Sequence, residues 1–342
     1  MSKQLAAVEE PPVSLSKKDL ESDQEVRWCP GCGDYAILAT LQRLIPSLGI
    51  KREDLVFVSG IGCSSRFPYY MNSYGFHTIH GRAPAVATGI KLANPELSTW
   101  VITGDGDALS IGGNHFIHLM RRNVDLNILL FNNRIYGLTK GQYSPTSEFG
   151  KITKSTPYGS LEKPVDPVSL ALAAGAGFVA RASATDATGL SEVLREATEH
   201  KGTSFVEIFQ NCNVFNDAAF DAFTDRKAKA DNQVQLKHGQ PLLFGKDNNL
   251  GVALENLSLK KIVVENSELS EAIVYDQTNP TLAAIIARMP FPEFPVPMGV
   301  FYKEARPCYE ELVHEQISAA TTKKGSGDLE KLLYSGDTWT VE

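Results

Sequence analysis

Four of the five cysteines are spaced so that they could hold a redox group together. Cys29 and Cys32 form a Cys-Pro-Gly-Cys pair, while Cys63 and Cys212 each follow a short apolar run. Four thiolates from separate loops can enclose a four-iron cubane cluster. A structural zinc site, a thioredoxin-like Cys-x-x-Cys couple and unconnected buried thiols are the alternatives, and the residues alone leave all of them open.

A second candidate site combines carboxylate and amide oxygens. Asp105 lies within a Gly-Asp-Gly-Asp sequence, and Asn133 follows 133 − 105 = 28 residues later. Mg²⁺ prefers oxygen ligands and usually takes only one or two protein side chains, leaving the other positions to phosphate oxygens and water. Glycines on both sides of Asp105 would let the backbone approach a diphosphate closely. The alternative is an Asp helix cap and an unrelated Asn turn.

The elements that must position these residues alternate between strands and helices. Five apolar runs predict strands: Leu55–Ser59, Trp100–Thr103, Leu126–Asn132, Gly177–Arg181 and Ser204–Gln210. Strands that are apolar along their whole length predict an α/β fold, with a mostly parallel sheet covered by helices on both faces. One helix near Gly113–Arg121 separates Asp105 from Asn133, so the crossover returns both to the same sheet edge, where ligands bind.

The ends of the chain differ in character from this patterned region. We expect a mobile N-terminal arm at 1–25, a cofactor- and cluster-binding domain at 26–215, a C-terminal extension at 216–320 that packs on the core or on a partner, and a tail at 321–342. Within the irregular C-terminal extension we expect strands near Lys260–Val264 and Ala272–Tyr275 and helices near Pro280–Met289 and Lys303–Ala320.

Composition excludes several classes of protein. The 342 residues are 43% hydrophobic and 21% charged, which is typical of a globular chain. The net charge of -7 argues against nucleic acid as a partner, because such binding needs a basic surface. No apolar stretch is long enough to span a membrane, and five cysteines without a secretory signal favour a cytoplasmic location.

The motifs resemble those of a known enzyme family. Gly104-Asp105-Gly106 with Asn133 resembles the thiamine diphosphate motif, and the segment from Asn132 to Thr146 resembles the β subunits of 2-oxoacid:ferredoxin oxidoreductases, of the 2-oxoglutarate synthase type. The likeness runs from about Trp28 to Cys212. It implies the diphosphate-binding domain of a thiamine diphosphate fold and an α subunit that completes the active site, in an enzyme of two α and two β chains.

The resemblance also implies roles for individual residues. Mg²⁺ would be held by Asp105, Asn133 and the backbone oxygen of Ile135. Thiamine diphosphate would contact Ile61, Gly62, Cys63, Ser64, Gly106, Asp107, Gly137 and Leu138. One 4Fe-4S cluster would be held by Cys29, Cys32, Cys63 and Cys212, whereas Cys308 matches no family ligand. The loop at Cys63 would therefore serve both redox centres.

The implied reaction is the coenzyme A-dependent oxidative decarboxylation of a 2-oxoacid, or its reverse, with ferredoxin as electron acceptor. We expect 2-oxoglutarate, giving succinyl-CoA and CO₂, because the Arg66 guanidinium is suited to a distal carboxylate. A surface arginine is the alternative. His80 could contact substrate or cofactor, or be an ordinary core histidine. Rival functions are a pyruvate or broad-specificity enzyme of the same family, a non-redox thiamine decarboxylase or synthase, and a zinc-stabilised scaffold.

Overall fold

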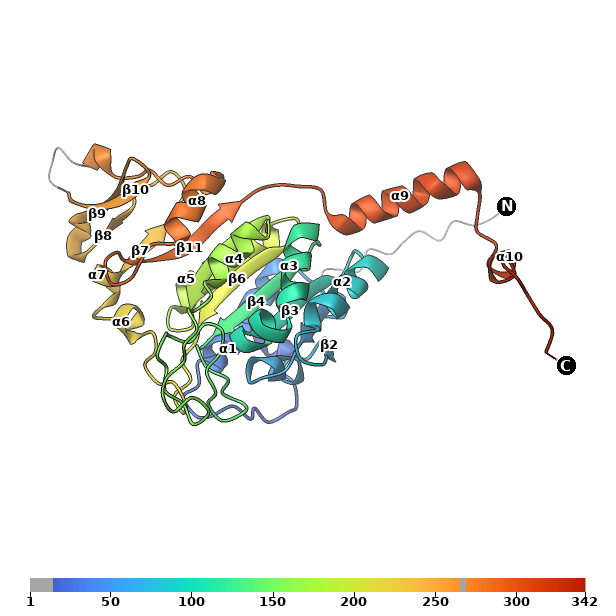
Figure 1. The fold of residues 1–342 in the computed structure, drawn as a ribbon, viewed down its shortest axis with the longest axis horizontal. Helices are drawn as coiled ribbons and strands as arrows, with labels where there is room; N and C mark the ends of the chain where they lie inside the picture. The colour runs from blue at the N-terminus through green and yellow to red at the C-terminus, as the bar shows by residue number, and fades with distance from the viewer. Residues whose placement is uncertain (1–14, 265–268, 342) are drawn as a thin grey trace.

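The chain forms one large sheet with helices on both sides. A computed structural model describes residues 15–264 and 269–341, and Figure 1 shows the sheet at the centre of the molecule. The strand order is β2-β1-β3-β4-β6-β5-β11-β7. The bounds are β1 Leu55–Ser59, β2 Tyr74–His77, β3 Ser98–Gly104, β4 Asn127–Asn132, β5 Phe178–Ser183, β6 Ser204–Phe209, β7 Gln233–Leu236 and β11 Val296–Lys303.

The first six strands of this order are parallel, and their carboxyl ends meet at one edge. Gly104 of β3 lies opposite Phe131 of β4, and Asn132 of β4 lies opposite Phe209 of β6. The residues that follow these strands are therefore neighbours in space although they are far apart in sequence. Strand β11 runs antiparallel to β5, and β7 is parallel to β11.

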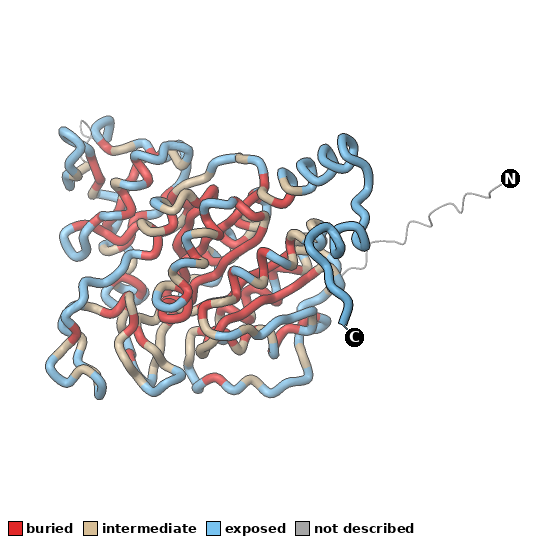
Figure 2. The backbone as a smooth tube through the Cα atoms, turned by 45° about the vertical axis from the view of Figure 1, so that its right-hand side comes forward, coloured by how far each residue is buried: buried red, intermediate tan, exposed pale blue. Residues whose placement is uncertain are grey.

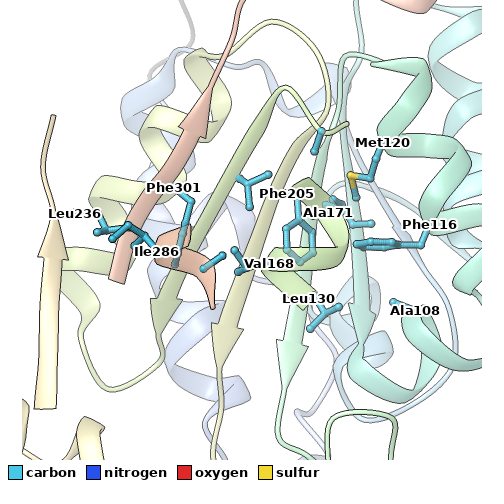
Figure 3. Close-up of a cluster of buried hydrophobic side chains, with 14 of the residues drawn as sticks. Ala108, Phe116, Met120, Leu130, Val168, Ala171, Phe205, Leu236, Ile286 and Phe301 are labelled. Atoms are coloured by element: carbon cyan, nitrogen blue, oxygen red, sulfur yellow. The ribbon is translucent and has the colours of Figure 1, made fainter. Parts of the chain in front are cut away.

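Alternation along each strand divides the core into two layers. In β1, Leu55 and Phe57 join one apolar cluster while Val56 and Val58 join the other. Helices α1 (Asp34–Leu44) and α5 (Ala187–Glu199) cover the first face. The second face is covered by α2 (Ala83–Ala93), α3 (Gly113–Arg122), α4 (Pro167–Ala173) and α8 (Pro280–Ala287). Figure 3 shows this second cluster, with Phe116, Phe205 and Phe301 among its labelled side chains.

The predicted fold class is confirmed, and the five predicted strands all occur. Their bounds agree with β1, β3, β4, β5 and β6 to within two residues, and the predicted helix at Gly113–Arg121 is α3. The agreement is close because fully buried parallel strands read as continuous apolar runs.

In the C-terminal extension one prediction is wrong and another misplaces the start of a helix. Ala272–Tyr275 is not a strand, because this segment makes only single bridges, at Ala272 and Val274, after a short 3-10 turn. The helix expected at Lys303–Ala320 begins only at Tyr309, as α9 (Tyr309–Lys324), and Lys303 ends β11. Pro307 accounts for the break, since proline disfavours a helical conformation of the residue before it.

The extension is more regular than the sequence indicated. It adds β7 and β11 to the main sheet and forms an antiparallel sheet of β8 (Leu243–Phe244), β9 (Leu250–Glu255) and β10 (Ser258–Val263). The remaining helices are η1 Lys17–Leu20, η2 Ile45–Leu48, η3 Arg52–Asp54, η4 Ser64–Tyr70, η5 Asp107–Ile111, α6 Asp221–Thr224, α7 Lys229–Asn232, η6 Lys246–Asn248, η7 Leu269–Glu271 and α10 Leu329–Leu333. The extension therefore shares the core of the sheet.

The two ends of the chain behave differently. Residues 1–14 of the expected arm lie outside the described residues, while η1 is docked on the body through the fully buried Leu20. Helix α9 is anchored where Glu310 accepts hydrogen bonds from the backbone of Asp125 and where His314 Nε2 lies 3.1 Å from Leu92 O, and its later turns project from the body (Figures 1 and 2). Among the described residues, no helix combines the length and apolar character that crossing a membrane requires.

Candidate functional site

The predicted cofactor and metal residues line one cavity at the carboxyl edge of the parallel strands. Its volume is about 160 Å³. The lining includes Ile61, Gly62, Cys63 and Ser64 after β1, Asp105, Gly106 and Asp107 after β3, and Asn133, Ile135, Gly137 and Leu138 after β4. His80 and Tyr136 also line it. Tertiary structure thus brings together residues from four segments that the sequence separates.

Asp105 is held rigidly in this cavity. Its carboxylate is buried, and Oδ2 accepts hydrogen bonds from Ser144 Oγ at 2.5 Å and from Thr146 Oγ1 at 2.7 Å. Burial raises the pKa of Asp105 to about 6, and the two hydroxyl groups act in the opposite direction. Thr146 Oγ1 also lies 3.0 Å from Asn132 Oδ1, which links the carboxylate to the end of β4. The supporting hydroxyls were not recognised from the sequence.

Asn133 and Ile135 are placed side by side by a tight turn. Ile135 N donates to Asn133 Oδ1 at 3.1 Å, and Arg134 N donates to Asn132 Oδ1 at 3.1 Å. Arg134 adopts a positive φ of 56°, which an L-residue rarely does. This turn directs two of the predicted metal ligands into the cavity that also contains Asp105.

Gly106 is required at its position by a close aromatic neighbour. The ring of Tyr136 lies where a Cβ atom would stand, and the Tyr136 hydroxyl donates to Gly106 O at 3.0 Å. Any larger residue would push this ring away. Tyr136 is a site residue that sequence reasoning missed, although it lies inside the segment that carried the family resemblance.

The four predicted cysteines line a second cavity next to the first. Its volume is about 220 Å³. Both cavities are lined by Cys63, Asn133, Gly137 and Leu138. Cys308 lies elsewhere, buried at the N-terminus of α9. Cys63 is therefore the cysteine that connects the two cavities.

The cysteine cavity has a defined hydrogen-bond environment. Gln210 Nε2 donates to Cys32 Sγ at 3.0 Å, and Trp28 Nε1 donates to the carbonyl oxygen of Cys63 at 2.7 Å. Burial raises the pKa of the Cys63 thiol to about 12, and it also raises the pKa of Cys32. Within the described part of the chain, no three His, Cys, Asp or Glu side chains converge as the ligands of a single metal ion would.

Asp34 is an unexpected member of the first cavity. It begins α1, two residues after Cys32, and is only 1% exposed. Neither carboxylate oxygen has a hydrogen-bond partner among the described residues, and burial raises the pKa of Asp34 to about 7. A buried carboxylate without partners is costly and therefore points to a donor that arrives with a bound group. Its place in the Cys-Pro-Gly-Cys-Gly-Asp segment was the available sequence signal.

Arg66 lies beside the cysteines. It lines the second cavity and donates from Nη1 to the backbone oxygen of Arg27 at 3.1 Å. His80, by contrast, lines the first cavity, where its ring stands 6.4 Å from that of Tyr136. The sequence did not separate these two locations.

A larger cavity of about 680 Å³ lies between the end of β5, helix α5 and the strands β7 and β11. None of the residues predicted from the sequence to bind a cofactor or metal lines it. Its charged groups are partly paired with one another, as in the ion pair between Lys229 and Asp186. We therefore place the candidate site at the two smaller cavities.

Comparisons with known proteins show which family the chain resembles. Residues 60–208 match the model of the thiamine pyrophosphate enzyme, C-terminal TPP binding domain. The chain is 54% identical over 331 residues to the 2-oxoglutarate oxidoreductase subunit KorB of Mycobacterium tuberculosis, covering 95% of this chain and 88% of that protein. It is 50% identical over 190 residues to the β subunit of 2-oxoacid:ferredoxin oxidoreductase 1 of Aeropyrum pernix, covering 56% and 60%.

A solved structure extends the likeness to the whole fold. It is the 2-oxoglutarate:ferredoxin oxidoreductase of Magnetococcus marinus with 2-oxoglutarate, coenzyme A and succinyl-CoA bound. The TM-score is 0.75 at 33% sequence identity, and the match covers 95% of this chain and 97% of that one.

Proposed function

We propose a function from the premise that this chain belongs to the β subunits of 2-oxoacid:ferredoxin oxidoreductases. The chain would carry the thiamine diphosphate, Mg²⁺ and 4Fe-4S sites of an enzyme that oxidises 2-oxoglutarate. The chain is the β subunit of a 2-oxoglutarate-type oxidoreductase and acts with a partner subunit. The reaction we propose converts 2-oxoglutarate and coenzyme A to succinyl-CoA and CO₂ and reduces ferredoxin. It can also run in reverse.

One observation carries this proposal: Cys63 lines both cavities. A chain that only bound thiamine diphosphate would need no cluster of four cysteines against the wall of the cofactor cavity. Electron transfer between two centres, by contrast, requires them to lie close together. The shared wall of Cys63, Gly137 and Leu138 therefore favours a redox enzyme over a non-redox thiamine decarboxylase or synthase.

The residues of the first cavity fit a metal-bound diphosphate. Asp105 and Asn133 supply the carboxylate and amide oxygens that Mg²⁺ prefers, and two hydroxyls hold Asp105 in place. We assign the remaining protein ligand to the backbone oxygen of Ile135. Gly106, Asp107, Gly137 and Leu138 would contact the diphosphate, with Ile61, Gly62, Cys63 and Ser64 against the cofactor. The two unpartnered oxygens of Asp34 support a cofactor that brings its own donors.

The residues of the second cavity fit a group larger than one ion. Cys29, Cys32, Cys63 and Cys212 surround about 220 Å³, whereas one water molecule takes up roughly 30 Å³ of liquid. Four thiolates are the usual ligands of a 4Fe-4S cluster, and N–H groups such as that of Gln210 tune such clusters by hydrogen bonding to sulfur. Cys308 has no part in this site.

When bound, thiamine diphosphate supplies the carbanion chemistry that releases CO₂ from a 2-oxoacid, and the cluster accepts electrons singly. The chain's own residues bind and orient these groups. The loop after β1 carries Ile61 and Gly62 toward the first cavity and Cys63 toward the second, so it fixes their separation.

Substrate selection is the second part of the proposal. We assign Arg66 to the distal carboxylate of 2-oxoglutarate, since a guanidinium is suited to a carboxylate. The bound ligands named for the Magnetococcus enzyme, 2-oxoglutarate, coenzyme A and succinyl-CoA, support this substrate set. A pyruvate or broad-specificity enzyme is the alternative.

The partner is an α subunit, and we propose two α and two β chains in a cytoplasmic enzyme whose thiols stay reduced. Large apolar side chains exposed in the segment that follows the turn after β4 favour a covering partner. Tyr158 is 99% exposed, and Leu161 and Ile152 of the same segment are also exposed. Apolar groups gathered on a surface in this way commonly mark a protein interface.

An anaerobic substrate panel tests the proposal. The chain is purified with its co-expressed α subunit, and reduction of a viologen dye or ferredoxin is followed with 2-oxoglutarate or pyruvate, with and without coenzyme A. We expect coenzyme A-dependent reduction with 2-oxoglutarate preferred, in a protein that contains iron and thiamine diphosphate. A colourless, iron-free enzyme that decarboxylates without an electron acceptor would overturn it.

A further inference from the structure

We infer that Asp107 is a positioning residue that fixes the orientation and tautomer of His80, so that His80 Nε2 acts as an acceptor for a donor group bound in the cofactor cavity. The inference deepens the proposed function and rests on it. The family resemblance gave Asp107 only one role, which is contact with the diphosphate of the cofactor. The Asp107 backbone N–H could contact a diphosphate, but its carboxylate and a diphosphate repel each other, so the geometry of the side chain needs another explanation.

The Asp107 carboxylate is saturated by donors of this chain. It is 2% exposed. Oδ1 accepts from Ile61 N at 3.0 Å and from Gly81 N at 2.8 Å, and Oδ2 accepts from Thr103 Oγ1 at 2.6 Å. The fourth contact joins Oδ1 to His80 Nδ1 at 2.6 Å. This carboxylate therefore ties three separate segments together at the edge of the sheet.

The contact with His80 determines which ring nitrogen carries the proton. An ionised carboxylate can only accept hydrogen bonds, so Nδ1 must be the donor. In the neutral ring, Nε2 is then left without a proton and can accept one. Among the described residues, no hydrogen bond to His80 Nε2 occurs, and the side chain is 37% exposed where it lines the cavity.

The backbone around this pair leaves little freedom for another arrangement. Gly81, next to His80, has a φ of +72°, and a Cβ there would lie 2.5 Å from Gly112 N. Gly60 packs directly against the Asp107 carboxylate. Across the cavity, the ring of His80 faces that of Tyr136, whose hydroxyl is bound to Gly106. His80 is thus held between a carboxylate and a fixed aromatic ring, as an oriented proton acceptor would be.

The same carboxylate also reaches the loop of the cluster cysteine. Ile61 N, two residues before Cys63, is one of its four donors. A variant at Asp107 could therefore lower activity simply by loosening this loop. The experiment must separate that structural effect from an effect transmitted through His80.

A double-mutant cycle makes this separation. Asp107→Asn, His80→Gln and the double variant are prepared in the full chain with its co-expressed partner, and kcat, KM, iron content and the Kd of thiamine diphosphate are measured. We expect each single variant to lower kcat by about 100-fold with iron retained. The kcat of the double variant should equal that of the less active single variant. Losses that multiply would mean that the two residues act independently and would overturn the inference.

Chemical rescue tests the same contact with Asp107 unchanged, in case the Asp107→Asn chain does not fold. Turnover of His80→Ala is measured with added imidazole or 1-methylimidazole. Imidazole has an N–H group that could donate a hydrogen bond to the Asp107 carboxylate, whereas 1-methylimidazole has no N–H group. We expect rescue by imidazole alone. Equal rescue by both compounds would refute the inference. Rescue by neither compound would also refute it if the losses in kcat multiply in the double-mutant cycle.

Two controls complete the design. Thr88→Val removes a buried hydroxyl of α2 whose one hydrogen bond among the described residues is to Pro84 O, and it should leave all four measurements unchanged. Failure of the proposed function is distinguishable, because the unmodified complex would then lack iron, thiamine diphosphate or turnover of 2-oxoglutarate. Failure of the inference would leave that complex active.

Discussion

The thiols of Cys63 and Cys212 converge on the same side of Gly137. A Cβ atom at Gly137 would lie 3.6 Å from Cys63 Sγ and 3.5 Å from Cys212 Sγ, although the two cysteines lie 149 positions apart in sequence (212 − 63 = 149). Gly137 also lines the cofactor cavity. The turn after β4 thus lies in the wall between the two cavities, and a Cβ atom at Gly137 would reach both thiols at ordinary van der Waals distance.

Removal of a cluster cysteine should abolish iron binding. We expect Cys212→Ala to lose the cluster, because three thiolates leave one iron without its protein ligand. Iron content and the broad absorption near 400 nm, measured on anaerobically purified complex, check this. Cys308→Ala is the matched control and should retain iron, since Cys308 lies outside the cysteine cavity. One zinc and no iron per chain would contradict the cluster.

Loss of the hydroxyls that support Asp105 should weaken metal binding. Ser144→Ala combined with Thr146→Val removes both donors to Asp105 Oδ2 while leaving the carboxylate in place. We expect the Mg²⁺ concentration needed for thiamine diphosphate binding to rise by about 10- to 100-fold, as for other groups that orient a metal ligand. Quenching of protein fluorescence during titration measures it. An unchanged requirement would show that Asp105 needs no support.

Replacement of Arg66 should change substrate preference. We expect Arg66→Ile to lower kcat/KM for 2-oxoglutarate by about 10- to 100-fold, because a charged hydrogen bond to the distal carboxylate is lost. Turnover of pyruvate, which has no distal carboxylate, should change little. Arg66→Lys should retain part of the preference. An equal loss of kcat/KM on both substrates would mean that Arg66 acts on the cysteine cavity, which it lines, and does not select the substrate.

Asp34 should contribute to cofactor affinity. Its two buried oxygens have no partner among the described residues, so a donor on bound thiamine diphosphate would satisfy them. We expect Asp34→Leu to raise the Kd of thiamine diphosphate about tenfold or more, and Asp34→Asn to raise it less because one acceptor remains. Isothermal titration of the complex measures both values. The exposed Asp23→Leu is the control, and an unchanged affinity in Asp34→Leu would exclude this role.

His200 should make the protein sensitive to acid. Burial lowers the pKa of this 5% exposed histidine from 6.5 to about 4, so the unfolded chain takes up a proton first as pH falls. Stability is therefore lost between about pH 6.5 and about pH 4, by at most about 3 kcal/mol. As the pH falls through this range, we expect the thermal midpoint of unfolding of His200→Gln to rise relative to that of the natural chain. A difference in thermal midpoint that stays constant over this range would contradict it.

Much of the parallel core could be predicted because the signals are local. Buried parallel strands are apolar along their length, and β1, β3, β4, β5 and β6 all read this way. The rule that crossover connections return to the same edge then placed Asp105 and Asn133 together. The C-terminal extension could not be predicted in this way. Strand β11 owes its position to pairing with β5 and β7, whose sequences lie far from its own.

The sequence by itself determined which residues could do chemistry: four cysteines, an acidic glycine motif and an asparagine pair at strand ends, which carried the family resemblance. Only the tertiary structure decided which cavity each of these residues lines and which residues they contact. It placed Asn133, Gly137 and Leu138 beside Cys63 in the lining of both cavities, left Asp34 without a partner among the described residues and joined Asp107 to His80. The physical reason is that burial and hydrogen bonding depend on contacts between distant segments. Local periodicity records which face of an element is buried, and it carries no information on which residue of another loop that face will meet.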